Sequence, residues 1–88
     1  MTFQLTIEYK IPGEPPLVEE RFDSVERAYA RLVEAIFYNE TDVTEGHWPT
    51  LELTGRAEDI REWSVTFKDD DGVPTETFTE LWASIRAL

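Results

Sequence analysis

The chain contains no cysteine, which excludes disulfide bonds, thiolate metal sites and a cysteine nucleophile. It has a single histidine, His47, and no recognisable motif pairs this residue with a nucleophile. We therefore interpret His47 as an ordinary loop residue. No apolar run approaches the length that spans a membrane, and the first residues lack the basic and apolar regions of a signal peptide. A soluble cytoplasmic protein is expected.

Basic residues are also scarce, because eight Lys and Arg face nineteen Asp and Glu and leave a net charge of −11. This excess argues against direct binding to DNA, RNA or an anionic membrane, since such binding needs a basic surface. It favours solubility and attraction to a basic partner. The 88 residues are 41% hydrophobic and include three Trp, three Tyr and five Phe. That is enough for one domain, residues 1–88, with a modest core.

Alternation of apolar and polar residues is the main strand signal in this sequence. It predicts strands over residues 3–9, 17–22, 50–54, 62–68 and 73–78. Pro74 suggests that the last of these lies at a sheet edge, because proline cannot donate to a strand ladder. Asp69-Asp70-Asp71-Gly72 predicts a hairpin turn between the last two strands. Residues 39–49 have no useful period and are interpreted as a loop.

Helical spacing of apolar residues predicts one amphipathic helix over residues 24–38, capped by Asp23 or Ser24. A second, short helix is predicted at the C-terminus, with an apolar face formed by Leu81, Trp82, Ile85 and Leu88. Each predicted helix follows a predicted hairpin, so a ββα pattern occurs twice. Any such unit repeats apolar alternation followed by helical spacing, and the likeness therefore does not establish a duplication.

The predicted fold is α+β, a two-layer arrangement with an antiparallel sheet of four to five strands and two helices on one face, in the order ββα-β-ββα. The opposite face of the sheet would be polar and rich in threonine, as expected for a solvated antiparallel face. Its charges nearly cancel, so most of the acidity should lie in the connections between elements.

Two of these connections supply the candidate partner-binding residues. Carboxylates in Asp69-Asp70-Asp71 suit a hard cation, but the spacing of a calcium loop is missing and a plain turn is favoured. No metal or cofactor site is therefore expected. Trp48 is either a cap on the open end of the core or an exposed anchor ringed by carboxylates. The candidate set is Glu40, Asp42, Glu45, Trp48, Asp69, Asp70 and Asp71.

In its small size, strong acidity, lack of cysteine and two-layer build, the chain resembles the acidic inhibitors encoded by phages and mobile elements. These are anti-CRISPR proteins, antirestriction proteins and other DNA mimics. The resemblance implies a non-enzymatic protein whose carboxylates occupy the Lys/Arg surface of a nucleic-acid-handling partner. Alternate residues on a strand are about 6.6 Å apart, comparable with successive phosphates along one DNA strand.

Two other classes remain open. An immunity or antitoxin-like protein would neutralise a basic toxin through the same attraction between its carboxylates and a basic surface. A structural or assembly module could form a homodimer through an exposed sheet edge at residues 73–78.

Overall fold

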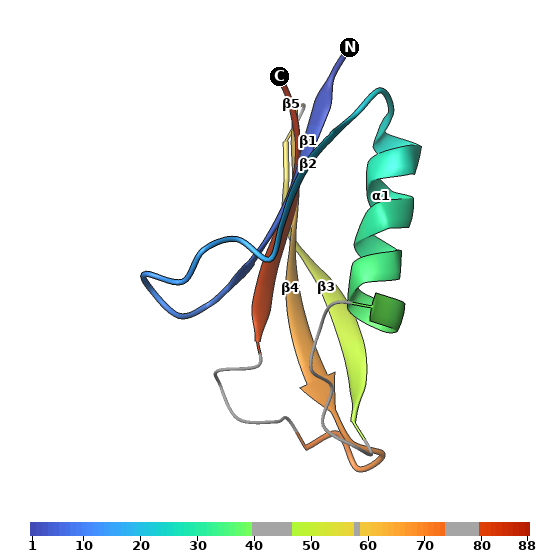
Figure 1. The fold of residues 1–88 in the computed structure, drawn as a ribbon. Coiled ribbons are helices and arrows are strands. Elements are labelled where there is room, and N and C mark those ends of the chain that lie inside the picture. The colour runs from blue at the N-terminus through green and yellow to red at the C-terminus, as the bar shows by residue number, and fades with distance from the viewer. Residues whose placement is uncertain (40–46, 58, 74–79) are drawn as a thin grey trace.

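The computed structural model describes residues 1–39, 47–57, 59–73 and 80–88, in which five strands form one antiparallel sheet with one α-helix on one of its faces (Figure 1). In chain order the elements are β1 (Phe3–Tyr9), β2 (Val18–Phe22), α1 (Val25–Glu34), a π-helical turn (Ala35–Asn39), β3 (Trp48–Arg56), β4 (Ile60–Lys68) and β5 (Leu81–Ala87). The strand order across the sheet is β2-β1-β5-β4-β3. The predicted α+β class with an antiparallel sheet is confirmed.

The predicted C-terminal helix is wrong, because residues 81–87 form β5, the central strand of the sheet. β5 pairs antiparallel with β1 on one side and with β4 on the other. Leu81, Ala83 and Ile85 are buried and point into the core. The apolar residues of this segment therefore fit the two-residue period of a strand as well as the helical spacing that suggested a helix. A helix this short is marginal, whereas a central strand gains two hydrogen-bonded neighbours. The ββα-β-ββα order is therefore not observed.

Helix α1 begins where the sequence predicted. Ser24 is its N-cap, with extended backbone and a side-chain Oγ that accepts a hydrogen bond from the Arg27 N–H at 3.2 Å. The buried face carries Ala28 and Leu32, and the π-helical turn continues it with Ala35 and Ile36. The helix packs against β1, β2 and β5.

An ion pair ties the solvent side of the helix to the sheet. Arg31 Nε lies 3.0 Å from Glu20 Oε1 of β2, and the same guanidinium lies 3.6 Å from Glu34 Oε1. Arg27 forms a largely exposed ion pair with Asp23 at 3.5 Å. Both arginines of the helix thus have a carboxylate partner nearby.

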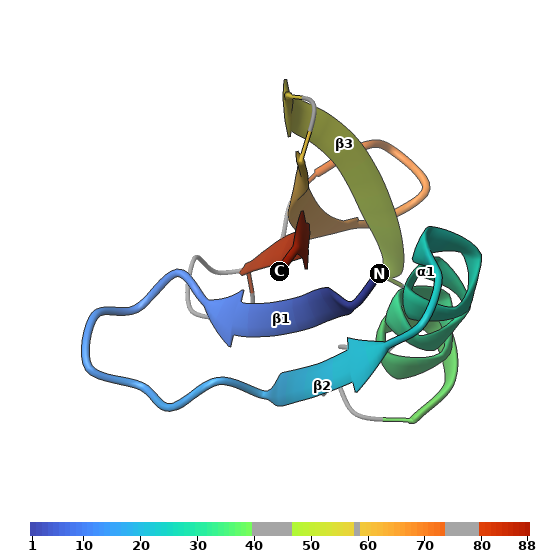
Figure 2. The same cartoon turned by 90° about the horizontal axis from the view of Figure 1, so that it is seen from above.

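The core lies between α1 and the helix-facing side of β1, β4 and β5. Leu5, Ile7, Val65 and Phe67 are almost completely buried there, and Trp63 stacks at a tilt against Tyr29 with ring centroids 5.8 Å apart. The sheet twists strongly, so that β3 turns steeply away from β1 and β2 (Figure 2). None of the helices among the described residues is both long and apolar enough to cross a membrane.

The bounds of β2, β3 and β4 differ from the predicted ranges 17–22, 50–54 and 62–68, and those of β3 differ most. β3 is longer than residues 50–54 and includes Trp48 and Pro49, which the sequence placed in a loop. The register of β3 on β4 shifts between Leu53 and Gly55, a β-bulge that bends this edge strand. The predicted strand over residues 73–78 lies outside the described residues, apart from Val73.

Candidate binding surface on the helix-free face

Two exposed tryptophans lie on the face of the sheet opposite α1. Trp48 opens β3 and is 55% exposed, and Trp82 lies on β5 and is 44% exposed. The strand register places them on one face, because Trp48 is opposite Lys68, Trp82 is opposite Ser64, and residues 64 and 68 of β4 point the same way. Large exposed aromatic side chains are enriched among the residues that dominate protein interfaces.

The acidic turn lies at the Trp48 end of this face. Trp48 is opposite Lys68, and Asp69 follows Lys68 directly, so the turn at Asp69–Gly72 adjoins the start of β3. The structure thus brings together Trp48 and the three aspartates of the predicted site. Trp48 is exposed, so the interpretation of this residue as a cap on the core is wrong, and its role as an anchor stays a prediction.

The three aspartates have different local roles. Asp69 Oδ1 accepts hydrogen bonds from the backbone N–H groups of Asp71 at 2.9 Å and Val73 at 2.8 Å, so its side chain holds the turn. Gly72 has a φ of +80° and donates its N–H to the Asp69 carbonyl at 3.0 Å. Asp70 and Asp71 are exposed. They are therefore the two members of the triplet that present charge to solvent.

Most carboxylates of this surface have no internal counter-ion. All eight Lys and Arg lie among the described residues, and the ion pairs that they form with other described residues involve Asp23, Glu20, Glu34 and Glu80. None of them pairs with the remaining described carboxylates of the face and the turn, which are Glu8, Glu19, Glu52, Glu62, Asp69, Asp70 and Asp71. The surface therefore keeps negative charge available for an external partner.

Lys10 fixes the position of Trp82. Its Nζ lies 4.0 Å from the centre of the Trp82 ring, donates to Ser64 Oγ at 2.7 Å and pairs with Glu80 Oε2 at 3.5 Å. The Lys10 side chain is only 16% exposed, so these contacts are partly shielded from solvent. One face of the indole is thus occupied by a cation, while the Trp82 side chain remains partly exposed.

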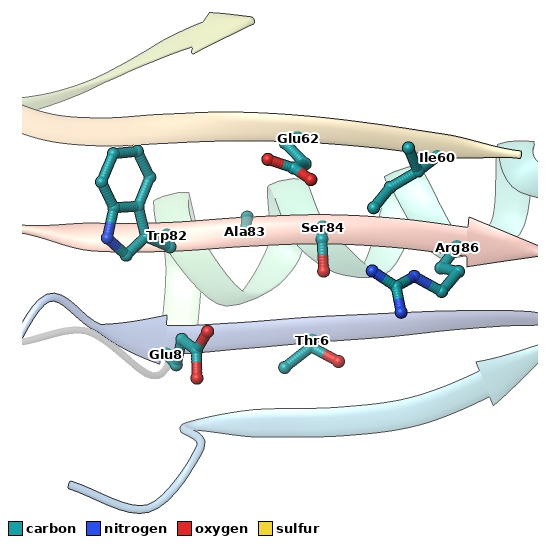
Figure 3. A pocket seen from close by; sticks show the side chains of 8 residues that line it. All are labelled: Thr6, Glu8, Ile60, Glu62, Trp82, Ala83, Ser84 and Arg86. Carbon is teal, nitrogen blue, oxygen red and sulfur yellow. The ribbon is translucent and has the colours of Figure 1, made fainter. Parts of the chain in front are cut away.

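A hollow of about 230 Å³ lies beside Trp82 at the centre of the face, and we call it the central hollow (Figure 3). Its lining residues come from the three middle strands and are Thr6, Glu8, Ile60, Glu62, Trp82, Ala83, Ser84 and Arg86. Figure 3 shows Glu8 and Glu62 on the two sides of β5, with Trp82 toward one end and Arg86 toward the other. The structure holds carboxylates, hydroxyl groups, a guanidinium and an indole within one concave site.

The remaining predicted site residues, Glu40, Asp42 and Glu45, lie outside the described residues. His47 is half-buried immediately before β3. The described residues contain no group of three or more His, Asp or Glu side chains arranged to hold a metal ion.

Sequence reasoning missed Trp82 and the central hollow because it assigned Trp82 to the apolar face of a helix. The signal was present: Trp82, Ser84 and Arg86 alternate with Leu81, Ala83 and Ile85. Read with period two, the pattern places Trp82 with polar residues on the outer face.

No protein-family model, curated protein or solved structure matches this chain.

Proposed function

We propose that this protein is a non-enzymatic acidic binding protein that inhibits a basic, nucleic-acid-handling partner by covering its DNA- or RNA-binding surface. The observation that carries the proposal is the group of unpaired carboxylates at Asp69–Asp71, adjoining the exposed Trp48 at one end of a rigid sheet. A net charge of −11 supports it, because such a charge attracts a Lys/Arg-rich surface and repels nucleic acid.

Charge and shape would have separate roles in this binding. Asp70 and Asp71 are exposed, so they accelerate association with a basic surface while each contributes little to affinity. Trp48 offers a large apolar contact that would be desolvated on binding, which is the usual basis of an interface hot spot. The outer face itself carries Arg21, Lys68 and Arg86 among its glutamates, so support for mimicry comes from the acidic end and not from a regular ladder of charge along the strands.

The test uses purified effector complexes that bind DNA, such as CRISPR effectors and restriction enzymes. Labelled DNA is bound to each complex, and its release is followed by fluorescence anisotropy as the protein is added. We expect release by the wild type and weaker release by Asp70→Asn/Asp71→Asn, which leaves the Asp69 turn bonds in place. Glu26→Gln on the exposed side of α1 is the matched control and should release DNA as the wild type does. Equal release of DNA by the wild type and both variants would show that the acidic turn does not contact the partner.

A basic toxin is the alternative partner, because an immunity or antitoxin-like protein would use the same acidic surface. The two are separated by adding the protein to a panel of basic ribonucleases and DNA-binding complexes. Selective inhibition of a toxin, with no effect on effector complexes, would favour the immunity function.

Self-association is a second candidate, and the β3 edge favours it. β3 is nine residues long and lies at an edge of the described sheet, with Leu53 49% exposed. The other edge, β2, carries Glu19, Glu20 and Arg21, charges of the kind that protect an edge from pairing. Sedimentation equilibrium tests this function: a monomer at all concentrations would remove an obligate β3 dimer, and a dimer abolished by Leu53→Lys would support it.

A further inference from the structure

We propose that the central hollow receives a single cationic side chain, an arginine or a lysine, of the basic partner. This inference rests on the proposed function in one respect, that the partner is basic. It names a second contact on the same face, separate from the acidic turn that carried the proposal above.

The volume of the hollow suits one side chain. About 230 Å³ corresponds to the share of liquid volume taken by roughly eight water molecules. The backbones of β1 and β4 are about 9–10 Å apart because β5 lies between them. The register places Glu8 opposite Trp82 and Glu62 opposite Ser84, so the two glutamates line the hollow from the two sides of β5 and are offset along it (Figure 3). An extended side chain entering from above would therefore meet a carboxylate on each side.

The charge balance of the hollow selects a cation. Among residues 1–39, 47–57, 59–73 and 80–88, neither Glu8 nor Glu62 has an ion-pair partner, and Arg86 has none there either. The lining thus carries two negative charges and one positive charge. A neutral partner that covered this face would leave uncompensated carboxylates out of water, which is costly. A single positive head group between the two glutamates brings the site to neutrality.

Trp82 would contact the methylene groups of that side chain. Lys10 already occupies one face of the indole, so the ring contributes apolar contact more than attraction for a second cation. The methylene groups of arginine and lysine bury readily along such a surface while the charged head reaches polar groups. The hydroxyl groups of Thr6 and Ser84 line the same hollow and can accept the remaining N–H donors.

The first experiment needs no partner. The full-length protein is titrated with N-acetyl-L-arginine N-methylamide, and amide and indole signals are followed by NMR. The matched control probe is the citrulline analogue, which has the same shape without the charge. We expect the arginine probe to shift the signals of Trp82, Ala83 and Ser84, and the citrulline probe to shift them much less. Equal shifts with both probes, or shifts confined to other residues, would overturn the inference.

Three variants make the test specific. Glu8→Gln and Glu62→Gln should each weaken binding of the arginine probe about two- to five-fold, the range of an exposed ion pair. Arg86→Gln removes the competing positive charge and should tighten binding about two-fold. Weaker binding by Arg86→Gln would contradict the inference and would assign the hollow to an anionic or zwitterionic ligand. Unchanged binding by both glutamate variants would overturn it as well.

The outcome also separates this inference from the proposed function. Asp70→Asn/Asp71→Asn should leave probe binding in the hollow almost unchanged, because neither residue lines it. If the probe binds as expected and no basic partner is inhibited, only the proposed function fails. If a partner is inhibited and Glu8→Gln/Glu62→Gln inhibits it as strongly as the wild type does, only the assignment of the hollow fails.

Discussion

Placing a lysine on each face of β5 distinguishes the central strand from a C-terminal helix. Ala83→Lys puts an ammonium group among Ile7, Trp63 and the helix, at a position that is buried in the sheet. Ser84→Lys makes the same substitution one residue later, on the opposite face, within the central hollow. In a helix whose apolar face held Leu81, Trp82 and Ile85, Ala83 would lie outside that face and lysine would be tolerated there.

The expected cost of Ala83→Lys follows from burial. Taking an unpaired charge out of water costs several kcal/mol even after relaxation. The whole stability of an 88-residue domain is about 4–13 kcal/mol. The substitution should therefore remove most of it. Ser84→Lys should remain within about 0.5 kcal/mol of the wild type, because its ammonium group reaches solvent and two glutamates.

Urea titration followed by tryptophan fluorescence measures both variants. If Ala83→Lys does not fold at all, Ile85→Ala supplies a graded value, with an expected loss of about 2–5 kcal/mol for a large buried side chain. Arg86→Ala is its exposed control on the same strand and should change stability by less than about 0.5 kcal/mol. Equal stability of Ala83→Lys and Ser84→Lys would refute the placement of β5 in the sheet.

Three further predictions concern local structure. Ser24→Ala should cost about 1 kcal/mol in a urea titration because it removes the N-cap hydrogen bond, whereas Asp23→Ala should cost less because its ion pair is exposed. Gly72→Ala should lower the free energy of unfolding by about 1–2 kcal/mol because its φ of +80° strains a residue with a Cβ, and Gly55→Ala, which has no such φ, should be tolerated better. Lys10→Met should alter Trp82 fluorescence and lower stability by about 1–3 kcal/mol, since it removes the bond to Ser64 and the contact with the indole; unchanged fluorescence would mean that Lys10 does not hold the ring.

Local signals in the sequence predicted much of the first half of the fold. Asp23 or Ser24 before an amphipathic run indicated where α1 begins, and the alternation around Leu5 and Ile7 indicated β1. These segments are long or well bounded, so one period fits them and the other does not. The antiparallel arrangement followed from the short connections.

The C-terminal segment could not be assigned in the same way. Leu81 and Ile85 are compatible with both the strand period and the helix period. What decides between the two periods is pairing with β1, whose paired residues lie 72 to 84 positions earlier in the chain. That long-range pairing is not visible in local spacing. Because the segment was assigned to a helix, Trp82 was placed on the buried face and not on the outer face of the sheet. The central hollow was therefore not predicted.

The sequence grouped some residues of the candidate site, but it could not show the local role of each one. Trp48 and Asp69–Asp71 were grouped from composition alone, and the β3–β4 register does bring them to one end of the sheet. Composition could not show that Asp69 holds the turn, because this depends on backbone N–H groups that follow it. The division of the triplet into one structural and two exposed carboxylates comes from the structure.

The central claim is that exposed carboxylates beside Trp48 direct this protein to a basic nucleic-acid-binding surface. Its most direct test is the salt dependence of DNA displacement from an inhibited effector complex, compared for the wild type and Asp70→Asn/Asp71→Asn. We predict that displacement by the wild type weakens as ionic strength rises, and that the variant is weaker at low salt with a shallower dependence. Displacement that is insensitive to salt, or identical for the two proteins, would contradict the claim.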